Sequence, residues 1–199
     1  MHYPKPLSQL IAIFQKLPGV GIKTAERFAF HVLNWPEEKL ADMASIIKNI
    51  KKNISHCLEC GSLVEEGNKC TICYNKNRNS KTLCIVASVK DVFLIEETRE
   101  YTGLYHVLGT LFSPIHGLAP SKKTIDKLKA RIVEMEIREI IIALDATLEG
   151  DATSLYLKKE LTNFSLSVSR LALGLPMGSS LDFIDGGTLA RAFSGRHAY

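Results

Sequence analysis

Two Cys-x-x-Cys pairs constrain this chain more than any other feature. The pairs are Cys57 with Cys60 and Cys70 with Cys73, and nine residues separate them. Four thiolates at such spacing form the ligand set of a tetrahedral zinc site. The segment between the pairs is too short for an apolar core, so we expect one zinc ion per chain to stabilise it. Because protein fills all four ligand positions, the expected zinc is structural and not catalytic.

Two disulfides or a redox pair are the alternatives for these cysteines. Both fit a cytosolic protein poorly. The first residues, from Met1 to Pro6, contain no apolar signal-peptide region, and the longest aliphatic run, Ile140 to Leu144, cannot span a bilayer. We therefore expect a soluble, cytoplasmic protein. The fifth cysteine, Cys84, lies in an apolar run and is expected to be a buried strand residue.

The segment Leu17-Pro18-Gly19-Val20-Gly21 lies between two amphipathic helical patterns, which run from Leu7 to Leu17 and from about Lys23 to Leu33. Pro18 ends the first helix, and the two glycines allow backbone angles that side chains disfavour. The turn leaves the first N–H groups of the second helix unpaired, which suits a phosphate oxygen. Lys23 and Arg27 lie four residues apart on one face of that helix.

These features resemble a helix-hairpin-helix element, which grips the DNA backbone without reading bases. An ordinary helical pair with a solvated basic face is the alternative. Residues 1–56 hold eight basic and four acidic side chains, an excess equal to the net charge of +4 for the whole chain. This location of the charge favours a surface that faces phosphates. A third helix is expected from Lys39 to Ile54, and its lysines Lys48, Lys51 and Lys52 are interpreted as a solvated face.

From Lys81 onward the pattern alternates between apolar strands and amphipathic helices. Helices are expected after Ser88-x-x-Asp91, after Ser121, and from Ala152 to Leu161. The alternation predicts an α/β domain with a parallel sheet whose functional edge lies at the carboxyl ends of its strands. The expected strands are Thr82–Val86, Tyr105–Leu108, Glu139–Leu144 and a short segment at 165–169.

The turn from Ala143 to Asp151 resembles the acidic motif of the Toprim domain. Catalytic members place an Asp-x-Asp at this strand end and a Glu at the end of the first strand, and together these hold magnesium. Here Thr147 replaces the second Asp and Ala87 stands at the Glu position, so Asp145 alone remains of that set. We interpret the domain as a Toprim fold without its chemistry, in which Asp145, Glu149 and Asp151 form a docking surface for a basic partner.

The tail after this domain carries apolar side chains that we expect to be buried against another surface. These are Leu181, Phe183, Ile184, Leu189 and Phe193. A short helix is expected at 188–193, after an Asp-Gly-Gly turn. The tail either folds back on its own domain or packs on another subunit, and the sequence leaves both possibilities open.

The order of these parts resembles the RecR family of bacterial recombination-mediator proteins, over essentially the whole chain. The expected architecture is an α/β multidomain protein: a helix-hairpin-helix domain at 1–54, a four-cysteine zinc finger at 55–77, a non-catalytic Toprim-like domain at 81–176, and a C-terminal oligomerisation or packing segment at 177–199. The most telling segments are Leu17 to Gly21, the four cysteines, Tyr105 to Gly109, Leu111-x-Ser113-Pro114, Thr147-x-Glu149-Gly150, and Asp185 to Leu189.

The resemblance implies a non-enzymatic DNA-binding protein of recombinational repair. Family members assemble into clamp-like rings and act with RecO and RecF to load RecA on gapped DNA. The implied DNA contacts are Gly19, Gly21, Lys23 and Arg27, and the implied RecO-binding acids are Glu149 and Asp151. Two departures from the family pattern are Ala87, where many members have Glu, and Asp145, where many have Asn.

Two other functions remain open on the sequence. A magnesium-dependent Toprim nuclease or topoisomerase-like enzyme would rely on Asp145. The second is an interaction protein that is stabilised by zinc and never contacts DNA. In such a protein the basic N-terminal segment would be an ordinary solvated surface.

Overall fold

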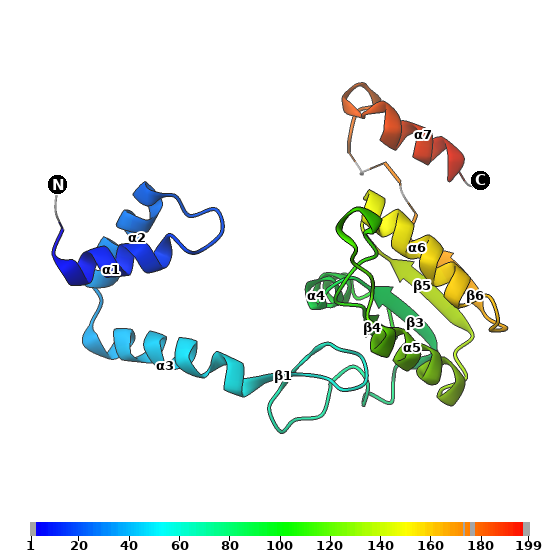
Figure 1. Ribbon diagram of the computed structural model, residues 1–199, viewed down its shortest axis with the longest axis horizontal. Helices are drawn as coiled ribbons and strands as arrows, with labels where there is room; N and C mark the ends of the chain where they lie inside the picture. Colours follow the sequence, from blue (N-terminus) through cyan, green and yellow to red (C-terminus); the bar gives the residue numbers. More distant parts are fainter. Residues whose placement is uncertain (1–2, 173, 176–177, 197–199) are drawn as a thin grey trace. The chain divides into compact units, whose positions relative to one another are not determined.

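The chain divides into two compact units, which meet in sequence at residues 53 and 54. The computed structural model describes residues 3–172, 174–175 and 178–196 (Figure 1). The expected tail and Toprim boundaries at 176 and 177, and the tail residues 197–199, lie outside these residues. Each unit is considered by itself.

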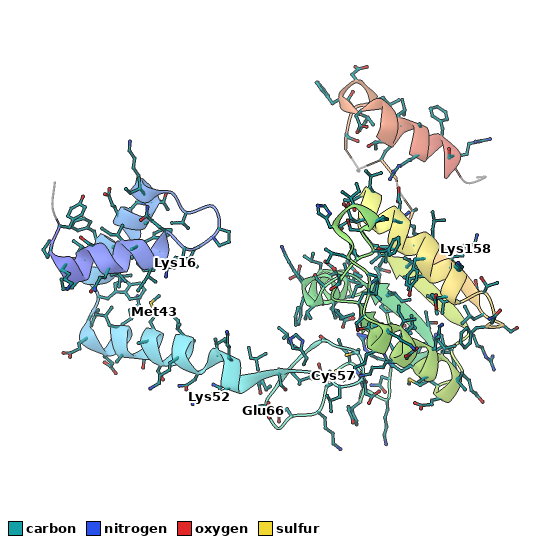
Figure 2. The ribbon with its side chains drawn as sticks, in the orientation of Figure 1. Lys16, Met43, Lys52, Cys57, Glu66 and Lys158 are labelled. Carbon is teal, nitrogen blue, oxygen red and sulfur yellow. The ribbon has the colours of Figure 1, made fainter. Side chains whose placement is uncertain are left out.

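The first unit, as described from residue 3 onward, contains three helices and a small apolar core. Its helices are α1 (Lys5–Phe14), α2 (Ile22–Leu33) and α3 (Glu37–Asn53). Ile11 of α1 and Ala25 and Ala29 of α2 are buried at the α1–α2 contact, because the expected three- and four-residue spacing places them on facing stripes. Met43 lies on the side of α3 that faces α1 (Figure 2), yet no residue of α3 is fully buried.

The second unit begins with a loop that holds the four cysteines. A short antiparallel hairpin, β1 (Ile54–His56) and β2 (Leu63–Glu65), carries the first Cys-x-x-Cys pair at its turn. We call residues 54–78 the four-cysteine loop. The backbone N–H of Val107 donates to the carbonyl of Cys60 over 2.9 Å, which attaches the loop to the sheet that follows.

A four-stranded parallel sheet in the order β4-β3-β5-β6 forms the centre of the second unit. The parallel sheet predicted from the strand–helix alternation is therefore confirmed. Its middle strands β3 and β5 are the two most apolar runs of the sequence, as a strand buried on both faces requires. The strands are β3 (Asn79–Val86), β4 (Gly103–Val107), β5 (Glu139–Ala143) and β6 (Ser167–Arg170).

Three helices cover the sheet, with α4 on one face and α5 and α6 on the other (Figure 1). Right-handed crossovers produce this arrangement, because the chain moves one way along the sheet after β3 and the opposite way after β4 and β5. The core between these layers includes Leu83, Val92, Leu128, Ile140 and Leu157. The helices are α4 (Val89–Thr98), α5 (Lys122–Glu134) and α6 (Leu148–Glu160).

Helix α6 begins four residues earlier than the sequence predicted. The hydroxyl of Thr147 accepts a hydrogen bond from the Gly150 N–H over 3.1 Å and caps the helix at that point. Glu149 and Asp151 therefore lie in the first turn of α6 and not in a loop, and acidic residues there interact favourably with the helix dipole. The expected start at Ala152 was therefore wrong.

Two further segments hold short elements. The long connection between β4 and α5 contains a 3-10 turn, η1 (Pro114–His116), and Ser113 pairs with Leu118 across it. The tail contains a second such turn, η2 (Leu181–Phe183), and helix α7 (Gly186–Ser194), which is capped by the Asp185 carboxylate. No helix in the described part of the chain is long and apolar enough to cross a membrane.

Candidate metal centre and phosphate-facing hairpin

The four cysteines converge on one point. Their Sγ atoms all lie within 4.8 Å of one another, with Cys57 and Cys73 4.0 Å apart and Cys60 and Cys70 3.7 Å apart. Tetrahedral coordination with bonds of ~2.3 Å places ligand sulfurs ~3.8 Å apart. The cluster thus has the size of a four-thiolate metal site. None of the four is in a disulfide.

Backbone N–H groups orient the sulfurs. Cys57 Sγ accepts from the Glu59 N–H over 3.4 Å, and Cys60 Sγ and Cys70 Sγ accept from the N–H groups of Ser62 and Cys73. Such N–H donors stabilise negative charge on the thiolates. Gly61 adopts a φ of +81°, and a Cβ there would lie 3.1 Å from Val107 Cβ. The tight turn after Cys60 therefore requires glycine.

The thiols differ in their readiness to ionise. A hydrogen bond with Cys73 lowers the pKa of the Cys60 thiol to about 5. That same hydrogen bond, followed by burial, raises the pKa of the Cys73 thiol. Burial also raises the pKa of the Cys70 thiol. Negative charges at these distances repel one another, so a divalent cation is needed for all four thiols to ionise together.

Cys84 does not belong to this cluster. It lies in β3, is 2% exposed, and burial raises the pKa of its thiol to about 12. The sequence-based interpretation of Cys84 as a buried strand residue is confirmed.

The hairpin between α1 and α2 leads into the N-terminus of α2, which no side chain caps. Gly19 has a φ of +78°, which disfavours any side chain, whereas Gly21 has an ordinary extended conformation with φ −76°. The expectation that both glycines need special angles was wrong for Gly21. Gly21 occupies the N-cap position of α2, where no side chain caps the helix and the first turn contains no acidic residue. The first N–H groups of α2 are thus open to an external anion.

Both basic residues of the hairpin are exposed, and neither forms an ion pair within the described residues. Lys23 lies in the first turn of α2, and Arg27 follows one turn later with its guanidinium 5.8 Å from the Phe28 ring centre. The structure therefore presents an open helix N-terminus with two unpaired cations beside it. This arrangement suits a phosphate diester backbone.

The acidic turn does not form a metal site of its own in the described part of the chain. Val86 and Ala143 pair in the parallel register of β3 and β5, so Ala87 and Asp145 follow neighbouring strands at the same sheet edge. The alanine side chain offers no metal ligand, so Asp145 has no acidic counterpart at the position that follows β3. Among the described residues, the four cysteines are the one group of three or more His, Cys, Asp or Glu ligand atoms that converge.

Comparisons with known proteins match this order of parts. Residues 7–51 match the family described as RecR, helix-hairpin-helix, residues 81–172 match the Toprim domain, and residues 174–197 match RecR, C-terminal. The protein named Recombination protein RecR from Protochlamydia amoebophila is 54% identical over 199 residues, covering 100% of both chains. This chain belongs to the RecR family.

Other relatives with the same name extend the match. Recombination protein RecR from Chlamydia pneumoniae is 50% identical over 199 residues, covering 100% of this chain and 99% of the relative. The protein of that name from Prochlorococcus marinus is 45% identical over 194 residues, covering 98% and 96%. The family resemblance read from the sequence motifs is confirmed, as is the fold class.

In this RecR-family chain, the three acids of the turn have different surroundings. Asp145 is exposed and Glu149 is half-buried, and neither forms an ion pair among the described residues. Asp151 forms two ion pairs, one with Arg170 of β6 at 2.7 Å and one with Arg191 of α7 at 2.9 Å. The hydrogen bond from Arg170 is the main cause that holds the pKa of the Asp151 carboxyl below its usual value.

Sequence reasoning missed the two arginines that hold Asp151. They lie 19 and 40 residues from Asp151 in the sequence, in two different elements, so no local spacing pattern connects them. The available signal was an arginine at the end of a predicted strand and another in the expected tail helix. The tail helix thereby contacts its own domain, at least through Arg191.

Proposed function

We propose that this protein is a non-enzymatic DNA-binding mediator of recombinational repair, which binds the DNA backbone through the hairpin between α1 and α2. The observation that carries the proposal is the uncapped N-terminus of α2 with Lys23 and Arg27 exposed beside it. Gly19 and Gly21 allow the backbone to approach the phosphates closely. The name of the relatives, Recombination protein RecR, supports the repair role.

The double variant Lys23→Ala/Arg27→Ala tests the DNA contact. Its affinity for DNA should fall for every sequence alike, and the slope of log affinity against log salt should become shallower by roughly two, because two phosphate contacts are lost. The matched control is Lys48→Ala/Lys51→Ala, which removes the same charge from the exposed face of α3 in the same unit. Wild-type affinity in the first variant, or equal losses in both, would rule out the hairpin as the DNA contact.

We propose that the four-cysteine cluster binds one structural zinc ion per chain. The sulfur separations and the N–H donors support a four-thiolate site. Metal analysis of the purified protein should find one equivalent of zinc, and Cys60→Ser should lose it. A metal-free protein that keeps the four-cysteine loop ordered would contradict the assignment.

We propose that the protein works as a homo-oligomer, a ring of two or four chains. One hairpin per chain neutralises few phosphates, so several linked copies are needed for firm binding. Large apolar side chains are also left exposed in the first unit, as a subunit contact would require. In α3 these are Ile46, Ile47 and Ile50, which are 65%, 62% and 45% exposed.

We propose that the acidic start of α6 recruits a basic partner protein, RecO, and that RecO and RecF act with this protein to load RecA on gapped DNA in the cytoplasm. Of the three acids in this turn, Asp145 and Glu149 form no ion pair among the described residues. Asp151 would present its charge only where a partner competes with Arg170 and Arg191.

Binding of purified RecO to Asp145→Ala/Glu149→Ala tests this surface. The control is Asp126→Ala/Glu134→Ala on α5, which removes equal charge from exposed positions. The first variant should bind RecO more weakly and with less salt dependence, and the control should bind normally. Equal binding by both variants would remove these acids from the proposed interface.

A further inference from the structure

The loop between β4 and α5, residues 109–120, lies beside the first half of α6 (Figure 1). Because β4 and β5 run parallel in one sheet, the loop after β4 and the acidic turn after β5 leave the same sheet edge. The backbone N–H of Phe112 donates to the Thr153 hydroxyl over 2.8 Å, and the Phe112 ring stacks on the Tyr156 ring with centroids 5.5 Å apart. The loop and α6 therefore form one continuous surface.

The outer end of this loop is held in one shape and carries exposed aliphatic side chains. Ser113 and Leu118 exchange two backbone hydrogen bonds, of 2.8 Å and 3.0 Å, across the turn that separates them. The Ser113 hydroxyl also pairs with His116 Nδ1 at 2.9 Å. Within this turn Ile115 is 85% exposed, and Leu118 is 51% exposed. A partner that covers these side chains loses little affinity to ordering of the loop, because the loop is already ordered.

Helix α6 exposes two leucines on the stripe next to this loop. Leu148 and Leu155 are 79% and 69% exposed, and two helical turns separate them, so they lie on one face of the helix. Thr153 and Tyr156, which contact the loop, lie on the adjacent face. We call the four exposed aliphatic residues of the loop and the helix the apolar ridge: Ile115, Leu118, Leu148 and Leu155. Large aliphatic side chains gathered in this way, unlike scattered single ones, indicate an interaction surface.

The ridge is acidic at the end where α6 begins. Asp145 and Glu149 form no ion pair among the described residues. Arg170 and Arg191 are the basic residues that approach this turn, and the charge of both is paired with Asp151. The charge available to a partner at this end is therefore negative. A complementary partner surface has an apolar centre and basic side chains along one edge.

We propose that the apolar ridge is the main contact for the basic partner protein, RecO, and that the unpaired acids orient that partner. The inference rests on the proposed recruitment of RecO at the start of α6 and adds the apolar part of the contact. Burial of the four aliphatic side chains supplies affinity, whereas the two acids supply orientation and faster association.

Calorimetric titration of the full-length protein, purified with zinc, with purified RecO tests the ridge. Ile115→Ser/Leu148→Ser should weaken binding by roughly tenfold or more, because two aliphatic side chains no longer leave water. This loss should be equal at low and high salt, and the heat capacity change of binding should become less negative. The control is Leu94→Ser/Val133→Ser, which removes aliphatic side chains of 52% and 66% exposure from α4 and α5 and should bind RecO normally.

The acidic-turn variant Asp145→Ala/Glu149→Ala separates this inference from the proposed function. Wild-type affinity of Ile115→Ser/Leu148→Ser, with a salt-dependent loss in the acidic-turn variant, would overturn the ridge and leave the recruitment of RecO standing. Absence of RecO binding by the wild-type protein would overturn both. Light scattering of Ile115→Ser/Leu148→Ser should find the wild-type molecular mass. A lower mass would assign the ridge to a contact between subunits and would also overturn the proposal.

Discussion

Gly150 shows how one residue without a side chain positions the acidic turn. It lies in the first turn of α6, directly above the Asp145 carbonyl, and a Cβ built on it would lie 2.0 Å from that oxygen. No backbone atom can accept such a contact without moving. The close approach of α6 to the end of β5 therefore depends on glycine, and it places Glu149 beside Asp145 at the sheet edge.

Gly150→Ala should therefore destabilise the protein by about 1–3 kcal/mol, because overpacking forces the α6 N-terminus away from β5. Urea unfolding measures the change. Gly174→Ala is the control, since a Cβ at Gly174 would meet no atom of the described residues within 4 Å. Equal stability of the two variants would mean that the turn relaxes freely around position 150.

The thiol of Cys84 should behave differently from the other four. Because its pKa is raised to about 12 by burial, it stays protonated at neutral pH and should not react with a thiol reagent in the folded protein. Removal of the proposed zinc ion with a chelator should expose four reactive thiols, and the fifth should react only after denaturation. A fifth rapid thiol in the native protein would show that β3 opens more easily than its packing indicates.

At the scale of elements, Asp151 connects three pieces of the second unit: α6, β6 and α7. Its partner Arg191 is 41% exposed, so this ion pair is worth at most ~1 kcal/mol. Arg191→Ala should leave global stability nearly unchanged and should accelerate amide hydrogen exchange in α7. Arg196→Ala is the control, because its guanidinium donates to the Phe193 carbonyl and not to an acid. Unaltered exchange in the Arg191 variant would show that α7 is held by other contacts.

The pH dependence of this contact follows from the lowered pKa of Asp151. The ordinary pKa of this carboxyl is 3.8. At a pH near 3.8 the native carboxyl binds fewer protons than the unfolded one, so its contribution to stability is fully present above that pH. This contribution is lost as the pH falls through the lowered pKa of the native carboxyl. The difference in α7 exchange between wild type and Arg191→Ala should persist down to pH 3.8. Loss of the difference near neutral pH would contradict the assignment.

The elements were predictable where local patterns determine them. The amphipathic patterns at 7–17 and 23–33 predicted helices α1 and α2, and the apolar run at Ile140–Leu144 predicted a strand. The start of α6 was not predictable in this way. Thr147 caps the helix just ahead of Gly150, and glycine is needed at that position because of its close tertiary contact with Asp145. Arg170 and Arg191 were not recognised as partners of Asp151, because the fold brings them together over long sequence distances.

At the scale of the whole molecule, the candidate sites are spread over both units. The hairpin that is proposed to bind DNA lies in the first unit, and the four-cysteine cluster and the acidic turn lie in the second. A single hairpin with two cations provides little binding energy at physiological salt. The proposed function thus depends on several chains acting together, so that their hairpins contact one DNA molecule at once.

Measurement of the molecular mass in solution, with and without DNA, tests this central claim most directly. Light scattering of the metal-loaded protein should find a complex of two or four chains. The same complex should be present on DNA, and Lys23→Ala/Arg27→Ala should keep its mass while losing the DNA. A protein that is a monomer alone and still a monomer when bound to DNA would contradict the account.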